Sequence, residues 1–215
     1  MEKSLINIAS LEKAIVSDAP FPHIVVSEFL NMEHAVTIQQ DFPRVNFPGS
    51  VPLTDVQYGP LFGKLLEELE GEVLRKAIEQ KFEIDLANRP TLITVRGKTR
   101  ARDGKIHTDT KSKLITLLLY FNSEWPHNGG RLRILRNREN LDDYVREISP
   151  LFGTCLIFKV TENCWHGHQP FEGERRAIQL NYLSGQAALK QHLSKHHMSA
   201  RLKTLKRWFA REDEY

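Results

Sequence analysis

KIHTDTKSKLITLLLYFN, residues 105–122, places a His-x-Asp pair shortly before an unbroken apolar run. That run has the Ile, Leu, Tyr and Phe content of a buried strand. It belongs to a series of short β-rich runs that Gly, Pro, Asn and Asp separate between Thr91 and about Ser184: TLITVRG, KIHTD, KLITLLLYFN, GRLRILR, TCLIFKV and RRAIQLNYL. Several strands at roughly even spacing favour a sandwich or barrel over a parallel sheet with crossover helices.

The segment before this β-rich region is predicted to be mostly helical. FPHIVVSEFL (21–30) is typical of a short strand, and NMEHAVTIQQDF (31–42) has a helical pattern with Asn at its cap position. The Pro- and Gly-containing loop FPRVNFPGSVP (42–52) follows and could lie beside a pocket. Residues 61–82 are predicted to form one amphipathic helix. Its apolar positions at helical spacing are Leu65, Leu69, Val73 and Ala77.

After Gly185 the chain is predicted to be helical again. The apolar residues of this segment are Leu189, Leu193, Leu202, Leu205 and Trp208, and its basic residues include Lys190, Lys195, Arg201, Lys203, Lys206 and Arg207. The basic face fits a solvated surface, and it also fits an acidic partner. We therefore expect one structural unit in three parts: an N-terminal strand and helices (1–90), a β core (91–184) and a C-terminal helical extension (185–215).

Composition limits the classes of function. The 30 basic and 27 acidic residues give a formal charge of +3, too small to indicate a nucleic-acid partner. Cys155 and Cys164 are the only cysteines, so neither a disulfide framework nor a four-cysteine zinc site is expected. The N-terminus lacks the pattern of a signal peptide, and no apolar run approaches about 18 residues. These features predict a cytoplasmic protein without a membrane span, and they do not indicate an oligomeric state.

The His-x-Asp pair is a candidate metal site. In a strand, residues i and i+2 point the same way, so His107 and Asp109 would present an imidazole and a carboxylate together. Two ligands make a weak site, but NCWHGHQPFEGERRAIQLNYL (163–183) supplies a third 59 positions after His107. That third ligand is His166, or His168 if the register differs. Two histidines and one carboxylate on one face of iron leave open positions, as in non-haem Fe(II) oxygenases.

The run RRAIQLNY (175–182) predicts a binder for a carboxylate. Its alternation puts Arg176, Ile178, Leu180 and Tyr182 on one face and Arg175, Ala177, Gln179 and Asn181 on the other. The apolar face should pack on neighbouring elements, which leaves Arg175 facing a polar cavity, although Arg176 is the alternative. Guanidinium groups bind carboxylates bidentately. Thr116 and Tyr120, on one face of the neighbouring run, bring hydroxyls that need a buried partner.

Taken together, these motifs resemble the Fe(II)- and 2-oxoglutarate-dependent dioxygenases, and most of all the prolyl-hydroxylase-like branch. The similar motifs are HTD, TLLLYFN, GGRL and a distal WHG with an Arg nine positions after its His. They cover about residues 91–184. The resemblance implies an all-β double-stranded β-helix, or jelly-roll, with N-terminal helices and a C-terminal helical extension.

The same resemblance implies the site and the activity. His107, Asp109 and His166 would bind Fe(II), while Arg175, Tyr120 and Thr116 would bind the distal carboxylate of 2-oxoglutarate. The implied reaction hydroxylates a C–H bond of a small molecule or a peptide side chain and converts 2-oxoglutarate to succinate and CO2. Ascorbate is a candidate reductant. The rival classes are a cupin-like metal enzyme that does not use 2-oxoglutarate and a non-catalytic binding module that retains the fold.

The sequence departs from this family just before the HTD motif. Many relatives have a tyrosine there, whereas VRGKTRARDGK carries Arg96, Arg100 and Arg102. This departure argues against simply assuming a prolyl substrate. Loops on a rigid sheet commonly carry specificity. We therefore expect at least one of these arginines to face the mouth of the pocket and to favour a negatively charged substrate, although a solvated loop fits the same residues.

Overall fold

The centre of the molecule is a six-stranded antiparallel sheet, which the computed structural model builds in the order β1-β7-β4-β9-β3-β2. The structure describes residues 3–195. The strands are β1 (His23–Val26), β2 (Val51–Pro52), β3 (Thr91–Thr99), β4 (Lys113–Tyr120), β7 (Cys155–Lys159) and β9 (Gly173–Leu183). The strands β1 and β2 come from the first 90 residues, so the N-terminal segment extends the sheet at both edges. The predicted division of the chain into three parts stays a prediction.

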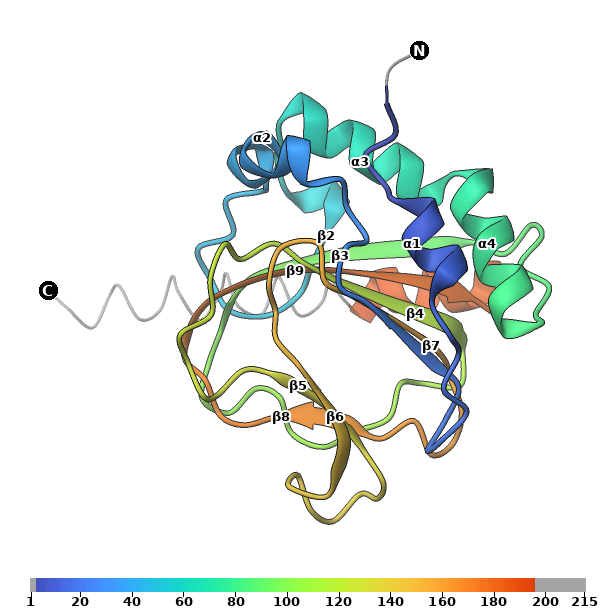
Figure 1. Ribbon diagram of the computed structural model, residues 1–215, viewed down its shortest axis with the longest axis vertical. Helices are drawn as coiled ribbons and strands as arrows, with labels where there is room; N and C mark the ends of the chain where they lie inside the picture. The colour runs from blue at the N-terminus through green and yellow to red at the C-terminus, as the bar shows by residue number, and fades with distance from the viewer. Residues whose placement is uncertain (1–2, 196–215) are drawn as a thin grey trace, which may run out of the picture.

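A smaller antiparallel sheet, in the order β6-β5-β8, faces the large one. It consists of β5 (Leu132–Leu135), β6 (Tyr144–Ile148) and β8 (His166–His168). Figure 1 shows the helices on one side of the large sheet and the small sheet on the other side. This antiparallel sandwich with flanking helices confirms the predicted jelly-roll core.

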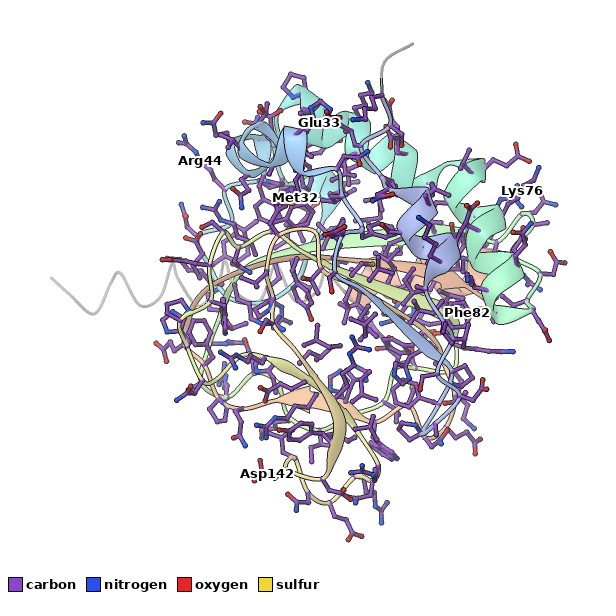
Figure 2. The ribbon with its side chains drawn as sticks, viewed as in Figure 1. Met32, Glu33, Arg44, Lys76, Phe82 and Asp142 are labelled. Carbon is purple, nitrogen blue, oxygen red and sulfur yellow. The ribbon has the colours of Figure 1, made fainter. Side chains whose placement is uncertain are left out.

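The helices form a layer on the large sheet because their apolar faces pack against it. Its members are α1 (Ile8–Lys13), α2 (Ala35–Asp41), α3 (Pro60–Glu70), α4 (Glu72–Phe82) and the short 3-10 helices η1 (Met32–His34) and η2 (Leu53–Asp55). In α3 and α4 the buried residues are Phe62, Leu65, Leu66, Leu69, Leu74, Ala77, Ile78 and Phe82. Figure 2 shows the Lys76 side chain extending outward from α4, whereas the buried Phe82 lies toward the sheet.

The prediction of one continuous helix over residues 61–82 is wrong. Gly71 has extended backbone angles (φ −71°, ψ 159°), and the chain starts a new helix at Glu72. The break shifts the apolar face, so Val73 is 67% exposed although its spacing from Leu69 predicted burial. Glycine is a weak helix former, which makes it a ready point for such a break.

The large sheet buries different residues on its two faces. Ile115, Leu117, Leu119, Ile178, Leu180 and Tyr182 belong to the core under the helices. Tyr120 and Ala177 belong instead to the core shared with the small sheet. This arrangement confirms the predicted alternation of β9 and directs its second face into the interior between the sheets.

Residues 186–195 are helical, and partly buried Leu189 and Leu193 pack against Leu92 and Leu183. The remaining predicted residues of this extension, Leu202, Leu205, Trp208, Arg201, Lys203, Lys206 and Arg207, lie outside the described residues. Within residues 3–195, no helix combines the length and apolar character that crossing a membrane requires.

Candidate metal and co-substrate site

His107 and His166 are held together by their backbones. Each backbone N–H donates to the other residue's carbonyl at 3.0 Å, which makes an isolated antiparallel bridge. The predicted strand over 105–109 is wrong as a strand, because only this bridge and a bond from the His168 N–H to the Gly104 carbonyl (2.8 Å) pair the segment with β8. Gly104 has a φ of 84°, a left-handed conformation that favours glycine and ends the regular ladder.

The imidazoles of this pair are oriented in the same way. The Nδ1 atom of His107 lies 2.8 Å from the Lys105 carbonyl, and that of His166 lies 2.8 Å from the Cys164 carbonyl. A carbonyl only accepts hydrogen bonds, so Nδ1 carries the proton and the Nε2 lone pair stays free in both rings. Metal-binding histidines are commonly fixed by such a bond from their second nitrogen.

Asp109 completes the cluster. One ligand atom each from His107, Asp109 and His166 lies within 4.8 Å of the other two. Burial lowers the pKa of His166 to about 4, together with the nearby His107, so the ring is neutral at pH 7. Neutral imidazoles and an ionised carboxylate are the forms that ligate a metal, so this donor set fits Fe(II).

The Asp109 carboxylate has two protein partners. Lys113 Nζ lies 2.9 Å from Oδ1, and the Thr116 hydroxyl donates to Oδ2. Burial raises the pKa of Asp109, but the charge of Lys113 and these hydrogen bonds outweigh it and hold that pKa below its usual value. A carboxylate has about four lone-pair sites, so the two bonds leave room for a metal.

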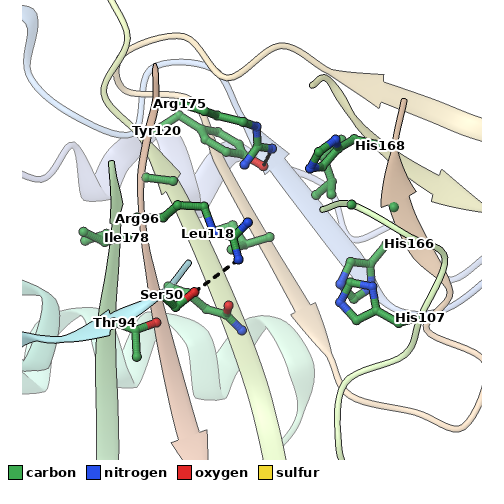
Figure 3. Close-up of a pocket in the computed structure, with 15 residues that line it drawn as sticks. Ser50, Thr94, Arg96, His107, Leu118, Tyr120, His166, His168, Arg175 and Ile178 are labelled. Atoms are coloured by element: carbon green, nitrogen blue, oxygen red, sulfur yellow. Dashed lines mark hydrogen bonds between the residues drawn. The ribbon is translucent and has the colours of Figure 1, made fainter. Parts of the chain in front are cut away.

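A cavity of about 120 Å³ adjoins the histidine pair, and Figure 3 shows Arg175 and Tyr120 across it from them. Arg175 is only 5% exposed. Its Nε donates to the Gly130 carbonyl at 2.8 Å, and its Nη2 donates to the Tyr120 hydroxyl at 3.4 Å. Burial keeps the pKa of Tyr120 raised, so its hydroxyl stays protonated. A buried guanidinium beside a hydroxyl is suited to bind a carboxylate.

The comparisons with known proteins agree with this geometry. The family model described as the 2OG-Fe(II) oxygenase superfamily matches residues 98–183. Residues 98–183 form a 2OG-Fe(II) oxygenase domain. The chain is therefore an enzyme that uses Fe(II) and 2-oxoglutarate. No curated protein sequence matches the oxygenase.

Solved structures share the fold of this oxygenase. A prolyl 4-hydroxylase from Pseudomonas putida aligns with a TM-score of 0.57 and 18% identity over 85% of this chain and 94% of that one. A prolyl 4-hydroxylase from Phytophthora capsici gives 0.56 and 14%, over 85% and 67%. An oxidoreductase of the 2OG-Fe(II) oxygenase family from Burkholderia pseudomallei gives 0.50 and 9%, over 85% and 92%. At these identities the likeness establishes the jelly-roll fold.

The structure distinguishes the two histidines and the two arginines of the distal motif, which were alternative candidates in the sequence. His168 is buried and lines the cavity, but the group of prospective metal ligands contains His166. Burial lowers the pKa of His168 to about 4, with a contribution from the charge of Arg175. Arg176 points away from the cavity that Arg175 lines, and its Nε pairs with Glu174 at 2.6 Å.

Thr116 lies beside the Asp109 carboxylate. Its hydroxyl contacts Asp109 and the Asn181 side chain (3.0 Å) and is not among the groups beside Arg175. These contacts place Thr116 beside Asp109, and the expectation that it binds the distal carboxylate of 2-oxoglutarate stays a prediction. The sequence does not indicate Lys113 as a site residue, because its contact with Asp109 depends on the turn between them and has no periodic signal.

Proposed function

We propose that the oxygenase hydroxylates a C–H bond of a small molecule or a peptide side chain, with His107, Asp109 and His166 as its iron ligands. The observation that carries the proposal is the convergence of three ligand atoms within 4.8 Å beside a cavity that ends at a buried guanidinium. The names of the prolyl hydroxylases with this fold support a peptide side chain as one class of substrate.

Each side chain has a defined task in this proposal. The Nε2 atoms of His107 and His166 and a carboxylate oxygen of Asp109 would hold the metal from one side and leave its other positions open. Bound Fe(II) supplies the oxidation of a C–H bond by dioxygen, coupled to the conversion of 2-oxoglutarate to succinate and CO2. Arg175 and Tyr120 would bind and orient the distal carboxylate of 2-oxoglutarate. Leu118, Leu132 and Ala177 line the cavity and limit the entry of water.

We also propose a reducing, cytoplasmic setting, in which ascorbate or a similar reductant keeps the iron ferrous. Cys155 and Cys164 support this setting because both are free and buried.

The ligand assignment is tested by removing one ligand at a time. His107→Ala, Asp109→Ala and His166→Ala should each abolish the formation of succinate from 2-oxoglutarate with Fe(II), ascorbate and air. Each should also weaken metal binding, which calorimetry with Mn(II) under argon measures without turnover. His168→Ala is the matched control and should retain one bound metal per chain. Loss of metal in His168→Ala, with retention in His166→Ala, would reject the assignment.

A further inference from the structure

A second guanidinium, that of Arg96 on β3, lines the same cavity as Arg175. Arg96 pairs with Ala177 across the β3–β9 ladder, so its side chain leaves the large sheet close to the small side chain of Ala177. It is 28% exposed. Figure 3 shows Arg96 between Arg175 and Ser50 on the sheet side of the cavity, with His107 and His166 on the opposite side.

Arg96 has few partners for a guanidinium in this position. Its Nη2 donates one hydrogen bond, to the Ser50 hydroxyl at 3.3 Å. Among residues 3–195, the nearest carboxylate is that of Asp103, 3.8 Å from Nη1. Asp103 already accepts the Arg100 backbone N–H at 3.0 Å and the Arg100 guanidinium at 3.2 Å. One carboxylate therefore serves two arginines, and it favours Arg100.

The charge in the cavity is unbalanced. Among the described residues that line it, Arg96 and Arg175 are cations and no side chain is a carboxylate. Burial and the charge of Arg175 lower the pKa of Arg96, and the charge of Asp103 offsets this only in part. 2-Oxoglutarate brings two carboxylates. In the proposed function one is bound by Arg175 and the other lies at the metal, so the charge of Arg96 is balanced only in part, by the Asp103 carboxylate that it shares with Arg100.

We propose that Arg96 binds a carboxylate of the primary substrate and so holds the C–H bond that reacts near the metal. This inference rests on the proposed function and adds the class of substrate to it. A guanidinium holds a carboxylate through two parallel hydrogen bonds, which orients as well as attracts it. One negative charge also matches the single unbalanced cation. The carboxylate belongs either to a free small molecule or to a peptide.

Nuclear magnetic resonance tests the binding without turnover. The full chain is loaded with Zn(II) and 2-oxoglutarate, and the Nε–Hε signal of Arg96, assigned by its loss in Arg96→Gln, is followed during titration with acetate. We expect it to shift with a dissociation constant on the order of 1–10 mM, and not to shift with acetamide. An equal response to acetamide, or no shift with acetate, would overturn the proposal. The proposal would also be overturned if 2-oxoglutarate alone shifts the Arg96 signal and acetate then causes no further shift, because Arg96 would then bind the co-substrate.

Turnover with matched probes tests the consequence for selectivity. Free L-amino acids are compared with their amides, and N-acetyl dipeptides with their C-terminal amides, by the succinate that each releases. The acid should exceed the amide in kcat/KM, and Arg96→Gln should reduce this preference by about tenfold to a hundredfold. Arg102→Gln removes the same charge from an exposed position outside the cavity and should leave the preference unchanged.

The two probe series also distinguish the source of the carboxylate. Stimulation by free amino acids alone points to a small molecule, and stimulation by the dipeptide acids alone points to a peptide. An acid preference that survives in Arg96→Gln rejects the role of Arg96. A wild-type chain that forms no succinate at all rejects the proposed function instead, and the acetate titration, which needs no turnover, still decides the binding by Arg96.

Discussion

Arg175 and Arg176 are adjacent and chemically identical, yet the pleat of β9 gives them opposite surroundings. Arg175 is enclosed between the sheets with Tyr120, whereas Arg176 lies near the surface, where it pairs with Glu174. A charged hydrogen bond in a desolvated site contributes about 1.5–3 kcal/mol. The same group in an exposed ion pair contributes about 0–1 kcal/mol, because solvent screens it.

We therefore expect Arg175→Lys to raise the KM for 2-oxoglutarate by about tenfold to a hundredfold. Lysine keeps the charge but loses the planar pair of donors. Bound Mn(II), measured by calorimetry, should stay at one per chain, because Arg175 is not a ligand. Arg176→Lys is the matched control and should change the KM by less than about twofold. Equal sensitivity at the two positions would contradict the assignment.

The sequence predicts the face of a strand residue better than its distance from a ligand. Period-2 alternation correctly places Arg175 in the interior and Arg176 outside it. The same logic puts Thr116 and Tyr120 on one face of β4, but four residues span about 13 Å of strand. That distance is long enough for Tyr120 to reach Arg175 while Thr116 reaches Asp109. The shared face of β4 therefore predicts one ligand for the hydroxyls of Thr116 and Tyr120, and only the tertiary structure shows that they have different neighbours.

At the scale of elements, the contact between β9 and the helices contains a buried polar group without a partner. The Tyr182 side chain is in the core under the helices, and its hydroxyl has no hydrogen-bond partner among the described residues. Burial raises the pKa of Tyr182 to about 12 from its usual 10.0. An unsatisfied buried hydroxyl destabilises a fold by about 1–3 kcal/mol relative to a satisfied one.

Tyr182→Phe should therefore raise the free energy of unfolding by about 1 kcal/mol at pH 7, measured by urea denaturation. Because the pKa is higher in the folded chain, the contribution of Tyr182 to wild-type stability is intact below pH 10 and is lost as the pH rises toward 12. The variant should lose this part of the alkaline decline. Tyr58→Phe, at an exposed tyrosine, serves as the control. A less stable Tyr182→Phe variant would show that the hydroxyl has a partner after all.

Strands are predictable from the sequence where apolar residues are frequent or alternate regularly. The sequence predicts the strands β3, β4, β7 and β9, because apolar residues fill β4 and β7 and alternate with polar ones in β3 and β9. It does not predict the strand β6, since its residues YVREI are mostly exposed and polar and pair only with β5. The histidine segment of β8 has the composition of a turn, because Trp, Gly and Pro surround it. Its pairing with β5 is a long-range contact that local propensity cannot supply.

At the scale of the whole molecule, the site connects the two sheets. His166 lies on β8 of the small sheet, and Arg175 lies on β9 of the large one. His107 and Asp109 belong to the connection between β3 and β4. A metal ligated by all three side chains would tie the small sheet to that connection. Ligands that bind only the folded state stabilise it in proportion to the logarithm of their concentration.

Zn(II) at about 100 times its dissociation constant should therefore stabilise the fold by about 2.7 kcal/mol. Differential scanning calorimetry should show this as a higher melting temperature. Hydrogen exchange should slow in β5 and β8, because opening of the small sheet would break the metal site. His166→Ala should show neither effect. Stabilisation of equal size in that variant would place the metal elsewhere.

The backbone bridge between His107 and His166 has a consequence for how a metal would assemble its ligands. The two residues are 59 positions apart, and joining such distant points of a flexible chain costs loop-closure entropy that grows with the logarithm of the separation. In the folded chain the reciprocal N–H to carbonyl bonds already hold the two residues together and offset this cost. An incoming ion thus encounters two imidazoles as a prearranged chelate, so its affinity reflects the chemistry of the donor atoms and hardly the length of the polypeptide between them.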